Sequence, residues 1–131
     1  MGNISENKLL NTELLLKFVH LQLTARCNLR CSFCGQWGDS GYMKKAEKKR
    51  ELNFSEWQKV IDSIFRHSEK EGLKPQFVIC GGEPLLSSSF AKIAELLKSY
   101  GFETGLVTNG TLLKEFAPII NKNINVVYVS I

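Results

Sequence analysis

The sequence predicts an α/β protein with a parallel sheet, and three observations support that fold class. Short β-rich segments alternate with amphipathic segments of helical period, in the order β-α-β-α-β-α-β. Alternation of this kind implies parallel strands joined by right-handed crossovers. A polar or cysteine-containing motif follows each strand, at the edge where parallel α/β sheets bind their ligands.

The composition is that of an ordinary globular domain. The chain has 131 residues, of which 44% are hydrophobic and 23% charged. The formal net charge of +4 is modest and does not indicate nucleic acid as a partner. No segment approaches the ~18 apolar residues of a membrane span, and no signal peptide is evident, so no membrane association is expected. Four cysteines, three of them closely spaced, fit a reducing cytoplasm.

The first strand is expected at Phe18–Thr24, after a polar N-terminal arm over residues 1–17. Its apolar and polar residues alternate, as in a half-buried strand. His20 falls within this alternation and is expected to be packed or hydrogen-bonded rather than catalytic. The charged segment Gly38–Glu51 is expected to be a solvated connector, and the alternative is a basic lip for an acidic substrate.

The clearest helix is expected over Ser55–Gly72. Ser55 and Gln58 have the spacing of a capping box, and Gly72 is a typical C-terminal stop. The apolar residues on one face are Phe54, Trp57, Val60, Ile61, Ile64 and Phe65. We therefore expect this helix to pack through that face.

The second strand is expected at Pro75–Cys80, with Cys80 as a small buried thiol at its end. A second helix is expected to start after Ser88 or Ser89 and to end at Gly101. Its inward-facing residues are Phe90, Ile93, Ala94, Leu97 and Tyr100.

The third strand is expected at Thr104–Thr108, and a third helix at about Leu112–Ile120, where Pro118 should bend or shorten it. A fourth strand is expected at Val126–Ile131. Because no helix follows to cover it, this strand would leave an exposed edge. We therefore expect residues 18–131 to be the N-terminal part of a larger domain, or a truncated product.

Three cysteines in one loop are the most specific feature of the chain. Cys27, Cys31 and Cys34 follow the first strand with the spacing C-x₃-C-x₂-C. Structural zinc is nearly always four-coordinate, and ordinary [4Fe–4S] clusters have four cysteine ligands. A trio therefore indicates a cluster with one iron left open. Two weaker alternatives are a zinc site that recruits Cys80 or His20, and a redox dithiol made of Cys31 and Cys34.

The loop Cys27–Cys34, with Phe33 before its third cysteine, resembles the signature loop of radical S-adenosylmethionine (SAM) enzymes. Gly81–Leu85 (GGEPL) after the second strand resembles the GGEP motif of that family. Thr108–Gly110 (TNG) resembles an element of its peptide- and cofactor-modifying branches. The resemblance covers nearly the whole chain from Phe18 onward. It implies the N-terminal four strands and three helices of a partial TIM-type (βα) barrel.

The resemblance also implies the cofactors and the reaction. The three cysteines would ligate three irons of a [4Fe–4S] cluster, and SAM would chelate the fourth iron. One electron, from a donor such as flavodoxin or ferredoxin, would cleave SAM to methionine and a 5′-deoxyadenosyl radical. This radical would abstract hydrogen from a substrate, a peptide or a small cofactor precursor.

By the same resemblance, backbone groups of Gly81 and Gly82, together with the Glu83 side chain, would meet the amino group of SAM. A backbone edge can approach that group only where no Cβ intrudes. Thr108 and Ser130, at the ends of the third and fourth strands, would hydrogen-bond the carboxylate of SAM. Phe33 belongs to the same cofactor-binding set.

Simpler interpretations stay open for each motif. GGEP can be a strand-to-helix turn with a solvated glutamate, and Asn109–Gly110 can be only a turn. Trp37 and Trp57 are expected to pack in the loop and in the helix core. The whole chain can alternatively be a truncated, non-catalytic iron–sulfur or zinc-binding module, or a plain α/β binding domain. Only the enzyme interpretation requires both an open iron and the GGEP edge.

Overall fold

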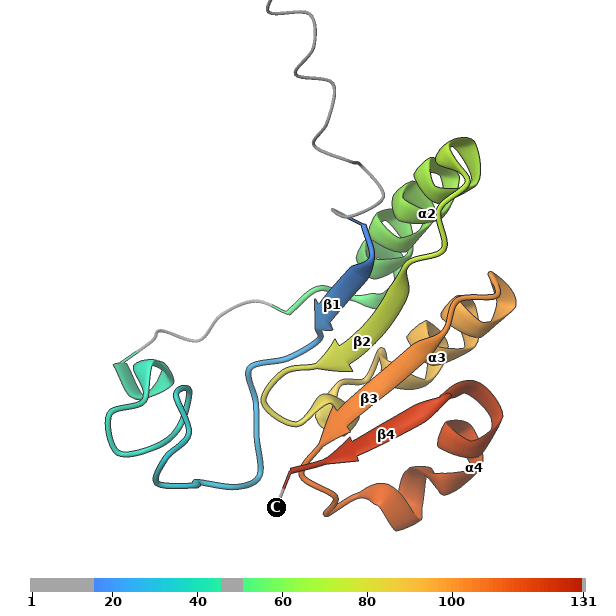
Figure 1. The fold of residues 1–131 in the computed structure, drawn as a ribbon. Coiled ribbons are helices and arrows are strands. Elements are labelled where there is room, and N and C mark those ends of the chain that lie inside the picture. The colour runs from blue at the N-terminus through green and yellow to red at the C-terminus, as the bar shows by residue number, and fades with distance from the viewer. Residues whose placement is uncertain (1–15, 46–50, 131) are drawn as a thin grey trace, which may run out of the picture.

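The computed structural model describes residues 16–45 and 51–130 (Figure 1). The strands are β1 (Phe18–Gln22), β2 (Gln76–Cys80), β3 (Thr104–Thr108) and β4 (Val126–Val129). The α-helices are α2 (Phe54–Glu71), α3 (Phe90–Ser99) and α4 (Leu113–Asn123), and the 3₁₀ turns are η2 (Tyr42–Lys45) and η3 (Pro84–Leu86). The predicted N-terminal arm up to residue 15, part of the predicted charged connector and the last residue of the predicted fourth strand lie outside the described residues.

The four strands form one open, parallel sheet in the order β1-β2-β3-β4. All four arrows in Figure 1 point the same way, so their carboxyl ends meet at one edge. This confirms the predicted fold class, an α/β arrangement consistent with part of a TIM-type barrel. The predicted third strand matches the observed bounds, whereas β1 stops two residues before the predicted end.

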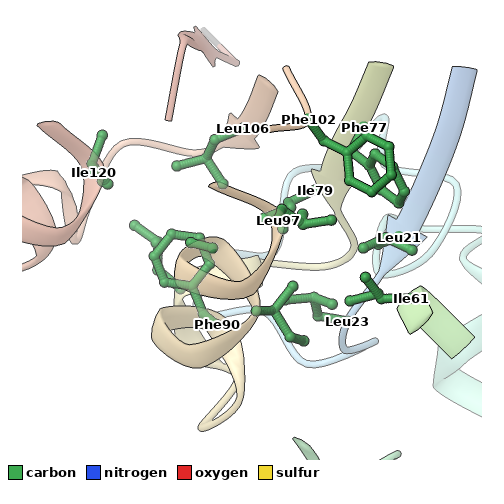
Figure 2. Packing of buried hydrophobic residues seen from close by; sticks show 13 residues of the cluster. Leu21, Leu23, Ile61, Phe77, Ile79, Phe90, Leu97, Phe102, Leu106 and Ile120 are labelled. Carbon is green, nitrogen blue, oxygen red and sulfur yellow. The ribbon is translucent and has the colours of Figure 1, made fainter. Parts of the chain in front are cut away.

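The helices α2, α3 and α4 cover one face of this sheet with a single apolar core. Leu21, Phe77, Ile79 and Leu106 contribute from the strands, and all four are buried. Figure 2 shows these side chains meeting those of the helices, among them Ile61, Phe90, Leu97 and Ile120. Full burial of such a side chain contributes roughly 1.5–3 kcal/mol, so this cluster is the main source of the stability of the sheet–helix unit.

The opposite face of the sheet has no helix in the described part of the chain. Phe18 on β1 is 57% exposed and Tyr128 on β4 is 55% exposed. His20 lies on the same face as Phe18 and is also exposed, so the expectation that it is packed is wrong. The alternation along β1 was read correctly, but sequence does not reveal which face a helix covers. Val60 of α2, expected to face inward, is likewise exposed, at 42%.

The N-terminus of α2 is capped by a different pair of residues from the pair that we predicted. Asn53 accepts a hydrogen bond from the Glu56 N–H, and the Glu56 side chain accepts one from the Asn53 N–H. This is a capping box, displaced by two residues from the predicted Ser55 and Gln58. Gly72 ends the helix in the left-handed conformation with φ 67°, as predicted.

Helix α4 continues through Pro118 and ends at Asn123, three residues beyond its predicted end, so the proline does not shorten it. Proline costs a helix one backbone hydrogen bond and crowds the preceding turn. Here Pro118 faces solvent, and Phe116, Ile119 and Ile120 on either side of it pack against the core. Tertiary packing therefore offsets the local cost.

Candidate active site at the carboxyl edge of the sheet

The chain leaving β1 stays paired with the GGEP segment. The Gly82 N–H donates to the Thr24 carbonyl at 2.8 Å, and the Glu83 N–H donates to the Arg26 carbonyl at 2.7 Å. These two bonds extend the β1–β2 pairing beyond the strands and carry it up to the residue before Cys27. The first predicted ligand therefore starts from a rigid position.

The two glycines of GGEP make this close approach possible. A Cβ on Gly82 would lie 2.2 Å from the Arg26 carbonyl oxygen, and one on Gly81 would lie 2.4 Å from that of Thr24. Gly81 also has φ 147°, which disfavours any other residue. We expected these glycines to be required for the close approach of SAM. The structure shows that they are already required for contact with the chain that leads into the cysteines.

The Glu83 carboxylate is buried and holds three donors, with none of its surface exposed. One oxygen accepts from the Leu85 N–H at 3.1 Å and the Thr108 hydroxyl at 2.8 Å, and the other accepts from the Asn109 N–H at 2.8 Å. We call these four residues the Glu83 network. A carboxylate without exposed surface requires such partners. The simpler interpretation of a turn with a solvated glutamate is therefore wrong.

The cysteine loop (residues 27–41) turns back on itself beyond the sheet, as Figure 1 shows. Backbone bonds from Gly38 to the Cys34 carbonyl and from Asp39 to the Ser32 carbonyl close it. A Cβ on Gly38 would lie 2.3 Å from the Ser32 carbonyl oxygen, so this fold of the loop requires glycine there. Phe33 is 84% exposed at the outside of the loop.

All four cysteines are free thiols, and the described residues supply N–H donors to two of the three in the loop. The Leu29 N–H lies 3.4 Å from the Cys27 sulfur, and the Trp37 N–H lies 3.5 Å from the Cys34 sulfur. Backbone N–H groups, that of Trp37 first, lower the pKa of Cys34 below its ordinary value. Groups that stabilise a thiolate suit a metal ligand, because the thiolate is the ligating form.

The TNG segment contacts the cysteine loop through Asn109. Its side-chain amide nitrogen lies 3.7 Å from the Cys27 sulfur and 2.8 Å from the Asn28 side-chain oxygen. Gly110 has φ 83°, so a turn is indeed present at this dipeptide. The segment is therefore a turn, and the side chain of Asn109 also reaches the predicted ligand loop. A role of this segment toward SAM stays a prediction.

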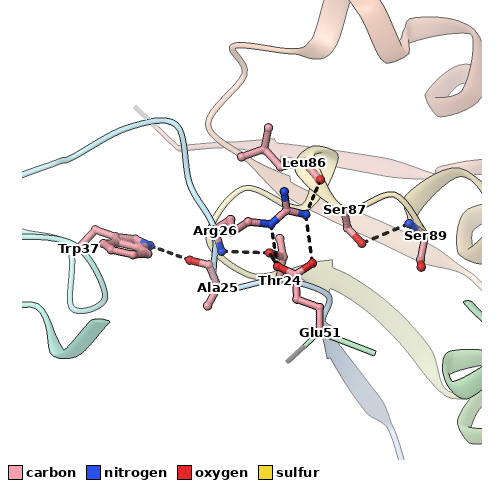
Figure 3. Close-up of polar contacts among 8 residues, drawn as sticks. All are labelled: Thr24, Ala25, Arg26, Trp37, Glu51, Leu86, Ser87 and Ser89. Atoms are coloured by element: carbon pink, nitrogen blue, oxygen red, sulfur yellow. Dashed lines mark hydrogen bonds and ion pairs between the residues drawn. The ribbon is translucent and has the colours of Figure 1, made fainter. Parts of the chain in front are cut away.

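A second set of polar contacts, shown in Figure 3, supports the chain just before the cysteines. Arg26 pairs with Glu51 at 2.8 Å and also donates to the Leu86 carbonyl at 2.9 Å. The Thr24 hydroxyl donates to the same Glu51, and Trp37 donates through its indole nitrogen to the Ala25 carbonyl at 2.7 Å. Glu51 was expected in a solvated connector, and this role could not be predicted from the sequence, because no spacing rule links residues 25 positions apart.

The remaining predicted site residues have mixed surroundings. The Thr108 hydroxyl is buried, donating to Glu83 and accepting from the Gly110 N–H at 3.1 Å. Ser130 is exposed after β4, and its N–H donates to the Thr108 carbonyl at 2.9 Å. Cys80 is half-buried at the end of β2, and burial raises the pKa of its thiol. The roles of Thr108 and Ser130 toward SAM stay predictions.

The three thiols of the loop are the donor type that both an iron–sulfur cluster and zinc accept. In the ranges 16–45 and 51–130, no three His, Cys, Asp or Glu side chains lie close enough together to hold one metal ion. The zinc alternative with Cys80 or His20 therefore has no support in this geometry. A cluster binds one thiolate at each of three irons, so its ligands are separated by the width of the cluster. Cys27, Cys31 and Cys34 supply the three thiols that such ligation needs, and their role as ligands stays a prediction.

The fold and this edge together define an α/β protein with a candidate iron–sulfur loop at the ligand-binding edge of a parallel sheet. The chain matches the family model of the radical SAM superfamily over residues 21–131. It therefore belongs to the radical SAM superfamily, whose members are SAM-dependent enzymes. No helix in the described part of the chain is long and apolar enough to cross a membrane.

Three curated relatives illustrate the range of this similarity. An S-adenosylmethionine-dependent nucleotide dehydratase of Selenomonas ruminantium is 28% identical over 72% of this chain and 30% of its own length. The tungsten-containing aldehyde ferredoxin oxidoreductase cofactor-modifying protein of Pyrococcus furiosus is 30% identical over 76% and 26%. A probable GTP 3′,8-cyclase of Thermococcus kodakarensis is 30% identical over 86% and 34%. The chain thus spans about a third or less of the length of these relatives.

Proposed function

We propose that this chain binds a [4Fe–4S] cluster through Cys27, Cys31 and Cys34, binds SAM beside it, and serves the reaction of a radical SAM enzyme. When bound, the cluster and SAM supply a 5′-deoxyadenosyl radical that abstracts hydrogen from the substrate. One observation carries the proposal. The cysteine loop, the GGEP segment and the TNG segment lie at one sheet edge and are connected by hydrogen bonds, among them the 3.7 Å contact from the Asn109 amide nitrogen to the Cys27 sulfur.

The part that the GGEP segment would play in SAM binding follows from which of its polar groups already make hydrogen bonds within the protein. The N–H groups of Gly82 and Glu83 already donate to Thr24 and Arg26. An ammonium group needs acceptors, so we assign its binding to the backbone carbonyls of Gly81 and Gly82. The Glu83 carboxylate is held inside by three donors, so we assign it the role of positioning this segment. Ser130 is the candidate for the carboxylate of SAM, because it is exposed. Thr108 would take that role only by giving up the hydrogen bond that its hydroxyl donates to Glu83. Phe33, exposed on the cysteine loop, is a candidate for a further contact with the cofactor.

The names of the relatives bear on the class of substrate. Two of the three name nucleotides, and the third names the modification of a cofactor. Between a peptide and a small cofactor precursor, these names favour a small molecule over a peptide. Reduction by a flavodoxin or a ferredoxin is part of the same proposal.

The test is anaerobic reconstitution with iron and sulfide, followed by low-temperature EPR of the reduced protein with and without SAM. A [4Fe–4S]⁺ signal that changes on addition of SAM is expected, because one iron would be open. Alanine at each of Cys27, Cys31 and Cys34 should remove the cluster, whereas Cys80→Ala is the matched control and should retain it. A cluster that is indifferent to SAM, or one that depends on Cys80, would contradict the proposal.

A further inference from the structure

The hydrogen bonds around Asn109 determine which way its side-chain amide is turned. The Thr111 N–H, which can only donate, lies 3.0 Å from the Asn109 side-chain oxygen. That contact identifies which end of the amide is the oxygen. The nitrogen of the same amide must therefore be the end that faces Cys27 and Asn28.

The side chains of Asn109, Asn28 and Thr111 form a closed ring of hydrogen bonds. The Thr111 hydroxyl donates to Asn109 at 2.7 Å, Asn28 donates to the Thr111 oxygen at 2.8 Å, and Asn109 donates to Asn28 at 2.8 Å. Each member both donates and accepts, so each bond reinforces the next. The second amide hydrogen of Asn109 is left for the Cys27 sulfur, 3.7 Å from the nitrogen.

The backbone of Asn109 is held from the opposite side by the buried carboxylate of Glu83, at 2.8 Å from the Asn109 N–H. Asn109 is therefore anchored to the core through its main chain and to the cysteine loop through its side chain. Among the residues that the structure describes, the contact from the Asn109 amide nitrogen to the Cys27 sulfur joins the TNG turn to a predicted ligand.

We propose that Asn109 is a positioning residue that donates a hydrogen bond to the sulfur of Cys27 and thereby raises the reduction potential of the cluster; this inference rests on the proposed function. Hydrogen bonds to the ligand sulfurs are among the factors that set cluster potentials. A donor stabilises the more negative, reduced state, so its removal makes the potential more negative. A single hydrogen bond changes such an equilibrium by roughly threefold to tenfold.

The test is an EPR-monitored redox titration of the full chain after anaerobic reconstitution, comparing Asn109→Ala with Thr111→Val. Asn109→Ala removes the donor to sulfur. Thr111→Val breaks the ring but keeps that donor, and so it is the matched control. We expect the Asn109→Ala potential to be more negative by up to about 59 mV, the one-electron equivalent of a tenfold change. Thr111→Val should change the redox equilibrium of the cluster by less than twofold. An unchanged potential in Asn109→Ala, or equal shifts in both variants, would overturn the inference.

A second measurement decides the matter if Asn109→Ala fails to fold or to retain a cluster. The unmutated chain is labelled with ¹⁵N only in the side-chain amides of asparagine, and the reduced cluster is examined by pulsed EPR. A coupling to ¹⁵N is expected, and its absence would overturn the inference. If the unmutated chain forms no cluster, the proposed function fails instead, so the two failures are distinguishable.

Discussion

The two parts of the candidate site are built in opposite ways. The Glu83 network is buried, with Glu83 0% and Thr108 2% exposed, and each polar group of its carboxylate has partners from the core strands or from the turns that follow them. The cysteine loop lies outside the core, and Cys31 at its centre is exposed. The ligands are therefore presented by a loop, and their anchor is the rigid sheet edge. Mutations should be able to separate the stability of the protein from its capacity to hold a cluster.

The largest loss of stability is expected from Glu83→Ala. The substitution would leave the N–H groups of Leu85 and Asn109 and the Thr108 hydroxyl buried without their acceptor, at about 1–3 kcal/mol for each unsatisfied group that water does not reach. We expect the free energy of unfolding, measured by urea denaturation, to fall by about 4 kcal/mol. Glu95→Ala on the exposed side of α3 is the control, and equal losses would contradict a structural role for Glu83.

Gly82→Ala should have the next largest effect, because it disrupts the backbone contact between the GGEP segment and the chain that leads into the cysteine loop. Its Cβ would overlap the Arg26 carbonyl oxygen at 2.2 Å and so separate the chain before Cys27 from β2. We expect a loss of about 2 kcal/mol in unfolding free energy together with reduced cluster content. Gly105→Ala is the matched control, since its Cβ would meet the movable Tyr128 ring at 3.2 Å and the Val126 carbonyl oxygen at an ordinary 3.8 Å. A harmless Gly82→Ala would mean that this pairing is dispensable.

A smaller and pH-dependent effect is expected from Glu51→Gln. The hydrogen bond from Arg26 lowers the pKa of Glu51, with help from Thr24 and against the effect of burial. A lowered pKa in the folded state stabilises above the ordinary glutamate value of about 4.3, and this contribution is lost as the pH falls through the folded-state pKa. Since the pair is partly exposed, we expect less than about 1 kcal/mol at pH 7.

The measurement for Glu51→Gln is the urea midpoint at neutral pH and at about pH 3.5, where the difference from the unmutated chain should shrink. Glu71→Gln is the control, because Glu71 is exposed and pairs loosely with Lys70 at 3.8 Å on the surface. A difference that grew toward acidic pH would show that the Arg26–Glu51 pair does not act as described.

The smallest effect on unfolding is expected from Gly38→Ala, although it should damage the cysteine loop. Its Cβ would collide with the Ser32 and Cys34 carbonyl oxygens at 2.3 and 2.5 Å, whereas nothing lies within 4 Å of a Cβ on Gly35. Because the loop lies outside the core, we expect a change in unfolding free energy below about 1 kcal/mol. Iron bound per chain should fall severalfold for Gly38→Ala and stay unchanged for Gly35→Ala. Equal iron contents would contradict the separation of the two parts.

Local patterns in the sequence predicted most of the sheet and helices. The apolar period of Phe90, Ile93, Ala94 and Leu97 predicted the buried face of α3, and these residues are fully buried. The glycine stop of α2 was also predictable, because the left-handed conformation belongs to glycine. The capping box was misplaced by two residues, since serine and asparagine compete for that position and only geometry distinguishes them.

The sequence by itself determined the alternating order of strands and helices, the parallel sheet, and the placement of three motifs at one edge. These features depend on periodicity and on spacing along the chain, which are local properties. Only the tertiary structure decided that Glu83 is buried, that Glu51 pairs with Arg26, and that Asn109 reaches Cys27. These contacts join residues 25 to 82 positions apart. Their energy depends on burial and on the direction of each donor, and both exist only once the strands have been brought side by side.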